Sequence, residues 1–145
     1  MDLSILSTKE KAESGVWFPV KIHGKTIPVE VLIYGEDSDK VQKYNATKIK
    51  KLGSLKASLT NGEIDLEDID IESLDTSIED AVARTGGMKT VDGSPLTLGD
   101  KNIDDSDESY RYVYSMIGEI KKFVIDKSRE RVNFLLGGKK SLRDL

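Results

Sequence analysis

Residues 16–34 read VWFPVKIHGKTIPVEVLIY, and this stretch decides the fold. On both sides of the pair His23-Gly24, apolar side chains recur at every second position, which is the period of β-strands. Glycine accepts a positive φ freely and histidine tolerates one better than most side chains, so the pair suits a tight turn. The stretch therefore predicts an antiparallel β-hairpin over residues 15–35. The alternating side chains are Val16, Phe18, Val20, Ile22, Ile27, Val29, Val31 and Ile33.

Two features limit this hairpin. Residues 3–14 place a few apolar side chains among polar ones, which predicts a short helix that Gly15 ends before the first strand. Pro19 and Pro28 have no N–H to donate to a neighbouring strand. We therefore expect their stretches to lie at a sheet edge or to turn their unpaired side away from a neighbour.

Residues 36–85 are predicted to be helical. Asp37 or Ser38 suits the N-cap of a basic helix that Asn61-Gly62 closes, with Gly53 as its weak point. The stripe of that helix comprises Val41, Tyr44, Lys48, Leu52, Leu55 and Leu59. The acidic stretch 64–83 also carries one apolar stripe, which favours a second helix, and Gly86-Gly87 is predicted to terminate it.

Residues 86–100 are predicted to form a turn or short strands. Asp92-Gly93 is a strong turn signal between residues 88–91 and 95–98, which suggests a second hairpin or an extended loop. An isolated hairpin is only marginally stable, so these residues could instead join the first sheet.

Residues 101–136 show helical spacing again. One stripe comprises Tyr110, Val113, Tyr114, Ile117, Ile120 and Val124, and Tyr112, Met116 and Phe123 occupy a second face. Residues 137–145 are predicted to form a flexible basic tail. The chain is thus expected to be a single α+β domain over residues 1–145, mostly helical with a small antiparallel N-terminal hairpin or sheet.

Charge is abundant and unevenly distributed. Charged residues make up 33% of the 145-residue chain and hydrophobic ones 37%, so the core should be lean. Residues 63–80 are acidic without a compensating Lys or Arg, whereas residues 40–56 and 121–143 are basic. Such segregation indicates solvated faces, or surfaces that meet each other or a charged partner.

The sequence offers no set of residues for catalysis. There is one histidine, His23, at a predicted turn, and there is no cysteine. The acidic run lacks the glycine that a calcium loop needs, and the Gly-Gly pairs lack the Lys and Ser/Thr of a phosphate loop. We therefore expect a protein without enzymatic activity, cofactor or metal. The net charge of -4 and the lack of a recognised motif also argue against nucleic-acid binding.

The apolar residues of the sequence bear on two questions, the location of the protein and its contacts with a partner. No stretch has the length of a membrane span, and the first residues lack the pattern of a signal peptide, so we expect an intracellular protein without membrane contact. Exposed aromatic and Met side chains would suit binding to another protein, although core packing is the commoner role for each such residue taken alone. The candidates are Trp17, Phe18, Tyr112, Met116, Phe123 and Phe134.

The order of short motifs adds a family resemblance. The motifs are residues 13–17 (ESGVW), 31–38 (VLIYGEDS) before a basic helix, 91–96 (VDGSPL) after an acidic helix, Asn102, and 120–125 and 131–134 (RVNF) near the end. In this order, which covers nearly the whole chain, the sequence resembles the tail assembly chaperones of long-tailed bacteriophages of the siphophage type.

The resemblance implies a function and its partners. Such a chaperone coats the long, helical tape measure protein in the host cytoplasm, hands it to the polymerising tail tube, and is absent from the finished virion. The tape measure protein is the implied partner, with the major tail protein as a second candidate, and self-association is possible. Two alternatives remain open: a structural minor tail or head-tail joining protein of the virion, and a bacterial adaptor protein with no phage role.

Overall fold

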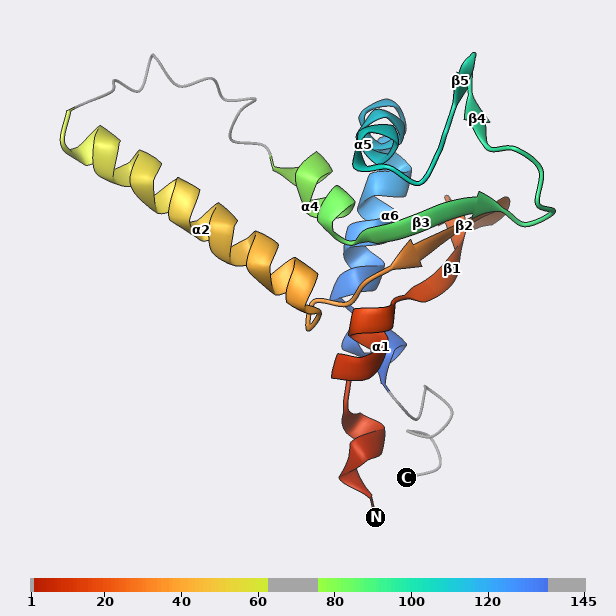
Figure 1. The fold of residues 1–145 in the computed structure, drawn as a ribbon, viewed down its shortest axis with the longest axis horizontal. Coiled ribbons are helices and arrows are strands. Elements are labelled where there is room, and N and C mark those ends of the chain that lie inside the picture. Colours follow the sequence, from red (N-terminus) through yellow and green to blue (C-terminus); the bar gives the residue numbers. More distant parts are fainter. Residues whose placement is uncertain (1, 63–75, 136–145) are drawn as a thin grey trace.

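The computed structural model describes residues 2–62 and 76–135, so the predictions for the acidic stretch 63–75 and the tail 137–145 lie outside the described residues (Figure 1). The α+β architecture predicted from the sequence is confirmed: helices predominate, and they accompany a small antiparallel sheet. The elements are η1 (Leu3–Leu6), α1 (Lys9–Ser14), β1 (Val16–Ile22), β2 (Lys25–Ile33), α2 (Asp39–Thr60), α4 (Ser77–Ala83), β3 (Thr85–Thr90), β4 (Thr97–Leu98), β5 (Lys101–Asn102), α5 (Asp107–Met116), α6 (Gly118–Arg129) and η3 (Arg131–Phe134).

The predicted hairpin is present. β1 and β2 pair antiparallel, from Val16 opposite Ile33 to Ile22 opposite Lys25. The two-residue turn between them has positive φ at both positions, 51° at His23 and 79° at Gly24. Both angles match the tight turn whose twist suits two paired strands. The hairpin prediction from alternation and turn residues is confirmed.

A third strand corrects the prediction for Gly86-Gly87. These glycines lie inside β3, which pairs with β2 in a sheet of order β1-β2-β3. The preceding helix α4 ends at Ala83 without a glycine cap. The physical role of both glycines is close packing: a Cβ at Gly86 would lie 2.5 Å from the Tyr34 hydroxyl oxygen, and one at Gly87 would lie 2.9 Å from the Trp17 ring. The missing side chains let two aromatic rings lie over the strand.

The Asp92-Gly93 turn exists, but no second hairpin closes around it. The Asp92 carboxylate accepts a hydrogen bond from the Ser94 N–H at 2.9 Å, and Gly93 has a φ of 79°. β3 pairs with β2, and the residues after the turn pair with later ones, β4 with β5. The alternative expectation, that residues near 88–91 join the first sheet, is confirmed. Two residues of the region predicted as helical from 101 form β5, and helix α5 begins only at Asp107.

The two prolines differ in position. Pro19 lies on β1, an edge strand, as expected. Pro28 lies on β2, the central strand, and therefore not at the sheet edge where a proline is usually found. The register with β1 shifts between Pro19 and Lys21, and the pairing with β3 begins at Val29. Pro28 therefore falls in an interruption of the ladder, where its missing N–H is tolerated.

The sheet has a second edge on β3. There the backbone N–H of Met88 donates to the Asp105 carboxylate at 3.2 Å. A side chain thus satisfies one donor that no strand pairs with.

Two predicted helices are interrupted. The expected helix over residues 3–14 is two short helices, η1 and α1, separated by Ser7 in an extended conformation, and Gly15 ends α1 as predicted. The C-terminal stripe is divided by Ile117, whose φ of -127° and ψ of 85° break the helix between α5 and α6. In contrast, α2 continues through Gly53 and ends at the Asn61 cap as predicted.

The core lies between one face of the sheet and helices α4, α5 and α6. Figure 1 shows α6 passing behind the strands, with α5 above β3 and α4 beside the start of β3. The predicted stripe of α5 and α6 is buried there, apart from the half-buried Ile117. The core residues are Val20, Val31, Ile33, Ala81, Val82, Met88, Tyr110, Val113, Tyr114, Ile120, Val124 and Phe134.

Gly35 generates a stability prediction. A Cβ at this position would lie 2.7 Å from the Ala12 Cβ and 3.1 Å from the Phe134 ring, in a region where α1, η3 and the chain after β2 meet. We expect Gly35→Ala to lower the free energy of unfolding by about 1–3 kcal/mol through overpacking. Gly53→Ala on α2, where a Cβ meets open space, is the matched control and should raise it by about 0.5–1 kcal/mol. Urea unfolding measures both, and equal midpoints for Gly35→Ala and the native chain would contradict the packing argument.

The buried tyrosines generate a pH prediction. Burial raises the pKa of Tyr114, and burial together with the Asp105 carboxylate raises the pKa of Tyr110. A raised pKa in the folded state means that each buried, neutral hydroxyl stabilises the fold. This contribution is fully present below the unfolded-state pKa of 10.0 and is lost as the pH rises above 10.0 toward the folded-state pKa. Each tyrosine should contribute a slope of about 1.4 kcal/mol per pH unit above that value. Urea unfolding between pH 8 and 11 should give a shallower decline for Tyr114→Phe, and an unchanged decline would refute the assignment.

Candidate protein interaction site

Helix α2 extends away from the rest of the fold. It has 22 residues and is therefore about 33 Å long at the usual helical rise. It begins beside the sheet, where the Ser38 hydroxyl caps the N–H of Val41 at 3.2 Å. Val41 is also its one fully buried residue within the described structure. Figure 1 shows α2 projecting from the body, so most of its length is not part of the core.

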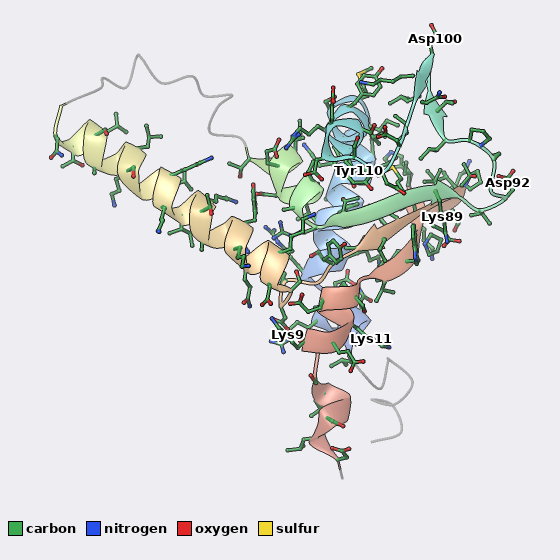
Figure 2. All side chains as sticks on the ribbon, viewed as in Figure 1. Lys9, Lys11, Lys89, Asp92, Asp100 and Tyr110 are labelled. Carbon is green, nitrogen blue, oxygen red and sulfur yellow. The ribbon has the colours of Figure 1, made fainter. Side chains whose placement is uncertain are left out.

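The exposed part of α2 is both apolar and basic. Ile49 is 69% and Leu52 is 43% exposed, and Tyr44, Leu55 and Leu59 are half-buried. The helix carries six lysines and one acidic residue, Asp39. Figure 2 shows side chains along its full length, and no other described element lies beside its C-terminal half in this view. Exposed apolar side chains on a strongly basic helix are typical of an interaction surface.

A groove lies between α2 and the start of α4. It has a volume of about 400 Å³. Its wall on α2 carries Leu52, Leu55 and Lys51, and its other wall carries Glu79 of α4 and Thr76, the residue before that helix. The ring of Tyr44 and the side chains of Thr47 and Lys48 complete the lining. The groove thus combines apolar side chains with polar and charged ones, which is the usual character of a binding site.

Asp80 holds α2 against α4. Its carboxylate accepts hydrogen bonds from the Tyr44 hydroxyl at 2.6 Å, from the Lys48 ammonium at 3.2 Å and from the Thr76 hydroxyl at 3.3 Å. Burial, and then the hydrogen bond to Asp80, raises the pKa of the Tyr44 hydroxyl. Tyr44 therefore remains a neutral donor at physiological pH. These bonds hold α2 beside α4, next to the groove.

Arg84 also joins the start of α2 to α4. Its side chain is buried, and its guanidinium donates to the Asp80 carbonyl at 2.7 Å and through Nε to the Glu36 carboxylate at 2.7 Å. Glu36 precedes α2, and Asp80 belongs to α4. The guanidinium therefore ties the start of α2 to the helix that forms the opposite wall of the groove.

The free charges of the groove region are positive. Lys48 is paired with Asp80, and Glu79 is paired with Arg111 at 2.5 Å. Lys50, Lys51 and Lys56 form no ion pair within the part of the chain that the structure describes. Among the described residues around the groove, the charged side chains without an ion pair are therefore lysines.

The six residues predicted as partner contacts are dispersed. Phe18 and Phe134 meet edge to face, with ring centres 6.1 Å apart, and Phe134 is only 1% exposed. Both belong to the packing between β1 and η3. Trp17 lies on the opposite face of β1, is 38% exposed, and carries the Lys89 ammonium 4.1 Å from its ring centre.

The remaining three predicted contacts lie on the C-terminal helices. Met116 is 62% exposed at the end of α5, and the half-buried Tyr112 carries the Lys101 ammonium 4.5 Å from its ring centre. Phe123, on α6, is half-buried and lines a smaller cleft of about 270 Å³ beside His23. Among the described residues the structure brings only Phe18 and Phe134 of the six into ring contact. Partner binding by these residues stays a prediction.

Sequence reasoning assigned the stripe of α2 to a helix but not to an exposed surface. The high lysine content on both sides of the stripe was the available signal that the helix is exposed. Lys48, a charged residue within the stripe, signalled that an acidic partner must lie nearby, and Asp80 is that partner.

Comparisons with known proteins return nothing. No protein-family model matches the chain, and neither the curated proteins nor the solved structures include a significantly similar one. Within residues 2–62 and 76–135, no group of acidic, His or Cys side chains is arranged to hold a metal ion. No helix in the same residues is long and apolar enough to cross a membrane.

Removal of Asp80 tests how α2 is held. Asp80→Ala leaves the Tyr44 hydroxyl and the Lys48 ammonium without their acceptor, so we expect about 1–3 kcal/mol of destabilisation. The backbone amides in the first half of α2 should exchange hydrogen for deuterium faster. Glu79→Ala, which removes an exposed ion pair on the neighbouring position, is the control and should cost about 0–1 kcal/mol. Equal exchange in both variants would show that Asp80 does not fix α2.

Proposed function

We propose that this chain is a tail assembly chaperone of a long-tailed bacteriophage, which binds the tape measure protein and keeps it soluble until the tail tube polymerises around it. The observation that carries the proposal is the order of short motifs over nearly the whole chain, from residues 13–17 to residues 131–134. This order resembles that of the chaperone family. The function involves no catalysis.

The projecting helix supports this proposal. A chaperone for a long helical protein needs exposed apolar surface that engages another helix without collapsing onto its own core. Ile49 and Leu52 provide such surface on α2, and the lysines around them keep that helix hydrated. A basic surface would also suit repeated binding along an elongated partner with acidic segments.

The proposal includes location and assembly. The protein acts in the host cytoplasm, is released as the tube forms, and is absent from the mature virion. Self-association and contact with the major tail protein are compatible with the same role.

Co-expression tests the proposed function. We expect a tape measure protein encoded in the same gene cluster to be soluble only when this chain is co-expressed, and the two to elute together in size-exclusion chromatography. Light scattering then gives the stoichiometry. A control chain carrying Gly35→Ala should reduce the yield of the complex only as far as it reduces folding.

Other outcomes point elsewhere. Unchanged solubility of the tape measure protein and no complex would reject the chaperone function. Detection of this chain in purified virions by mass spectrometry would instead favour a minor tail or head-tail joining protein. A chromosomal neighbourhood without tail genes would favour a bacterial adaptor protein.

A further inference from the structure

The groove between α2 and α4 has the shape that receives a helix. Along α2 the side chains of Tyr44, Lys48, Leu52 and Leu55 succeed one another at intervals of three or four residues, so they form one ridge along the helix axis. A ridge of this spacing fits between the side chains of another helix. The second wall comes from Thr76 and Glu79 at the start of α4.

The apolar side chains of the groove favour an apolar stripe on the partner. Leu52 and Leu55 line the groove together with the ring of Tyr44, whose hydroxyl donates to Asp80 and is already satisfied. A partner that covers these side chains gains about 25 cal/mol for each Å² of apolar surface removed from water.

The charges around the groove favour an acidic partner. Two charged side chains of the groove lining are neutralised within the chain, Lys48 by Asp80 and Glu79 by Arg111. Lys51, which also lines the groove, forms no ion pair with any described residue, and neither do Lys50 and Lys56 on the same helix. Complementary charge on the partner would therefore be negative.

We infer that this groove binds an amphipathic helix of the partner protein, with a leucine-type stripe against Leu52 and Leu55 and with Asp or Glu flanking that stripe toward Lys51. The identity of the partner as the tape measure protein rests on the proposed function. The preference for an acidic amphipathic helix rests on the groove itself.

The test uses synthetic peptides with the full-length protein. The probe is a fluorescein-labelled helical peptide of about 18 residues, or five turns, with Leu at a, d and e positions and Glu elsewhere. Two control peptides have the same residues scrambled, or Lys in place of every Glu. Fluorescence anisotropy in low and high salt should show saturable, salt-sensitive binding of the acidic amphipathic peptide and at least tenfold weaker binding of both controls.

Variants on α2 locate the binding. Leu52→Asp should weaken binding at least tenfold, and Lys51→Glu should weaken it several-fold and reduce its salt dependence. Ser54→Asp is the matched control, because it adds a negative charge to an exposed position on the same helix outside the groove lining. It should bind within about twofold of the native chain, allowing for weak long-range charge effects. Circular dichroism confirms that each variant keeps its helical content.

The outcomes separate this inference from the proposed function. Equal binding of the three peptides, or equal loss in Leu52→Asp and Ser54→Asp, would overturn the groove assignment. If the native chain and Leu52→Asp both keep the tape measure protein soluble, the proposed function stands and the groove inference falls. If neither does, while the peptides bind as expected, the groove inference stands and the proposed function falls.

Discussion

The guanidinium of Arg84 lies where α4 ends, β3 begins and the chain leaves β2. At 1% exposure its charge has to be met by protein groups, and Glu36 and the Asp80 carbonyl meet it. The backbone carbonyl of Arg84 also accepts the N–H of Tyr34 at 2.8 Å. One residue thereby joins the end of the sheet, the start of α2 and the helix that faces it. The junction holds the start of the projecting helix, and the bonds from Tyr44 and Lys48 to Asp80 add a second attachment further along α2.

The parts of the fold that local signals encode were predictable. The hairpin follows from alternation on both sides of His23-Gly24, and the buried stripe of α5 and α6 follows from helical spacing. The third strand was not predictable in the same way. Two glycines normally suggest a helix end, and only the rings of Trp17 and Tyr34, distant in sequence, explain why glycine is required inside β3. The division of the last helical region at Ile117 was also not predicted, although Gly118 follows directly and a glycine inside a helical pattern weakens it.

At the candidate site, the sequence could not show which side chains are exposed. Aromatic residues attract attention as partner contacts, yet a sequence cannot say which of them the core will use. Phe134 is buried against Phe18, whereas Met116 is largely exposed. The stripe of α2 has the spacing of a core-facing helix, and only the absence of other described elements along most of its length makes it a surface. Exposure depends on the whole fold and is therefore the property that periodicity predicts least well.

The two edges of the small sheet offer little to an incoming strand. Pro19 deprives the β1 edge of a donor, and Asp105 occupies the Met88 donor on the β3 edge. A strand from another molecule would find neither edge ready to accept it, so sheet extension, the common route to uncontrolled aggregation, is disfavoured. We therefore expect the sheets of two molecules to stay separate even at high protein concentration, so that close approach does not lead to strand exchange.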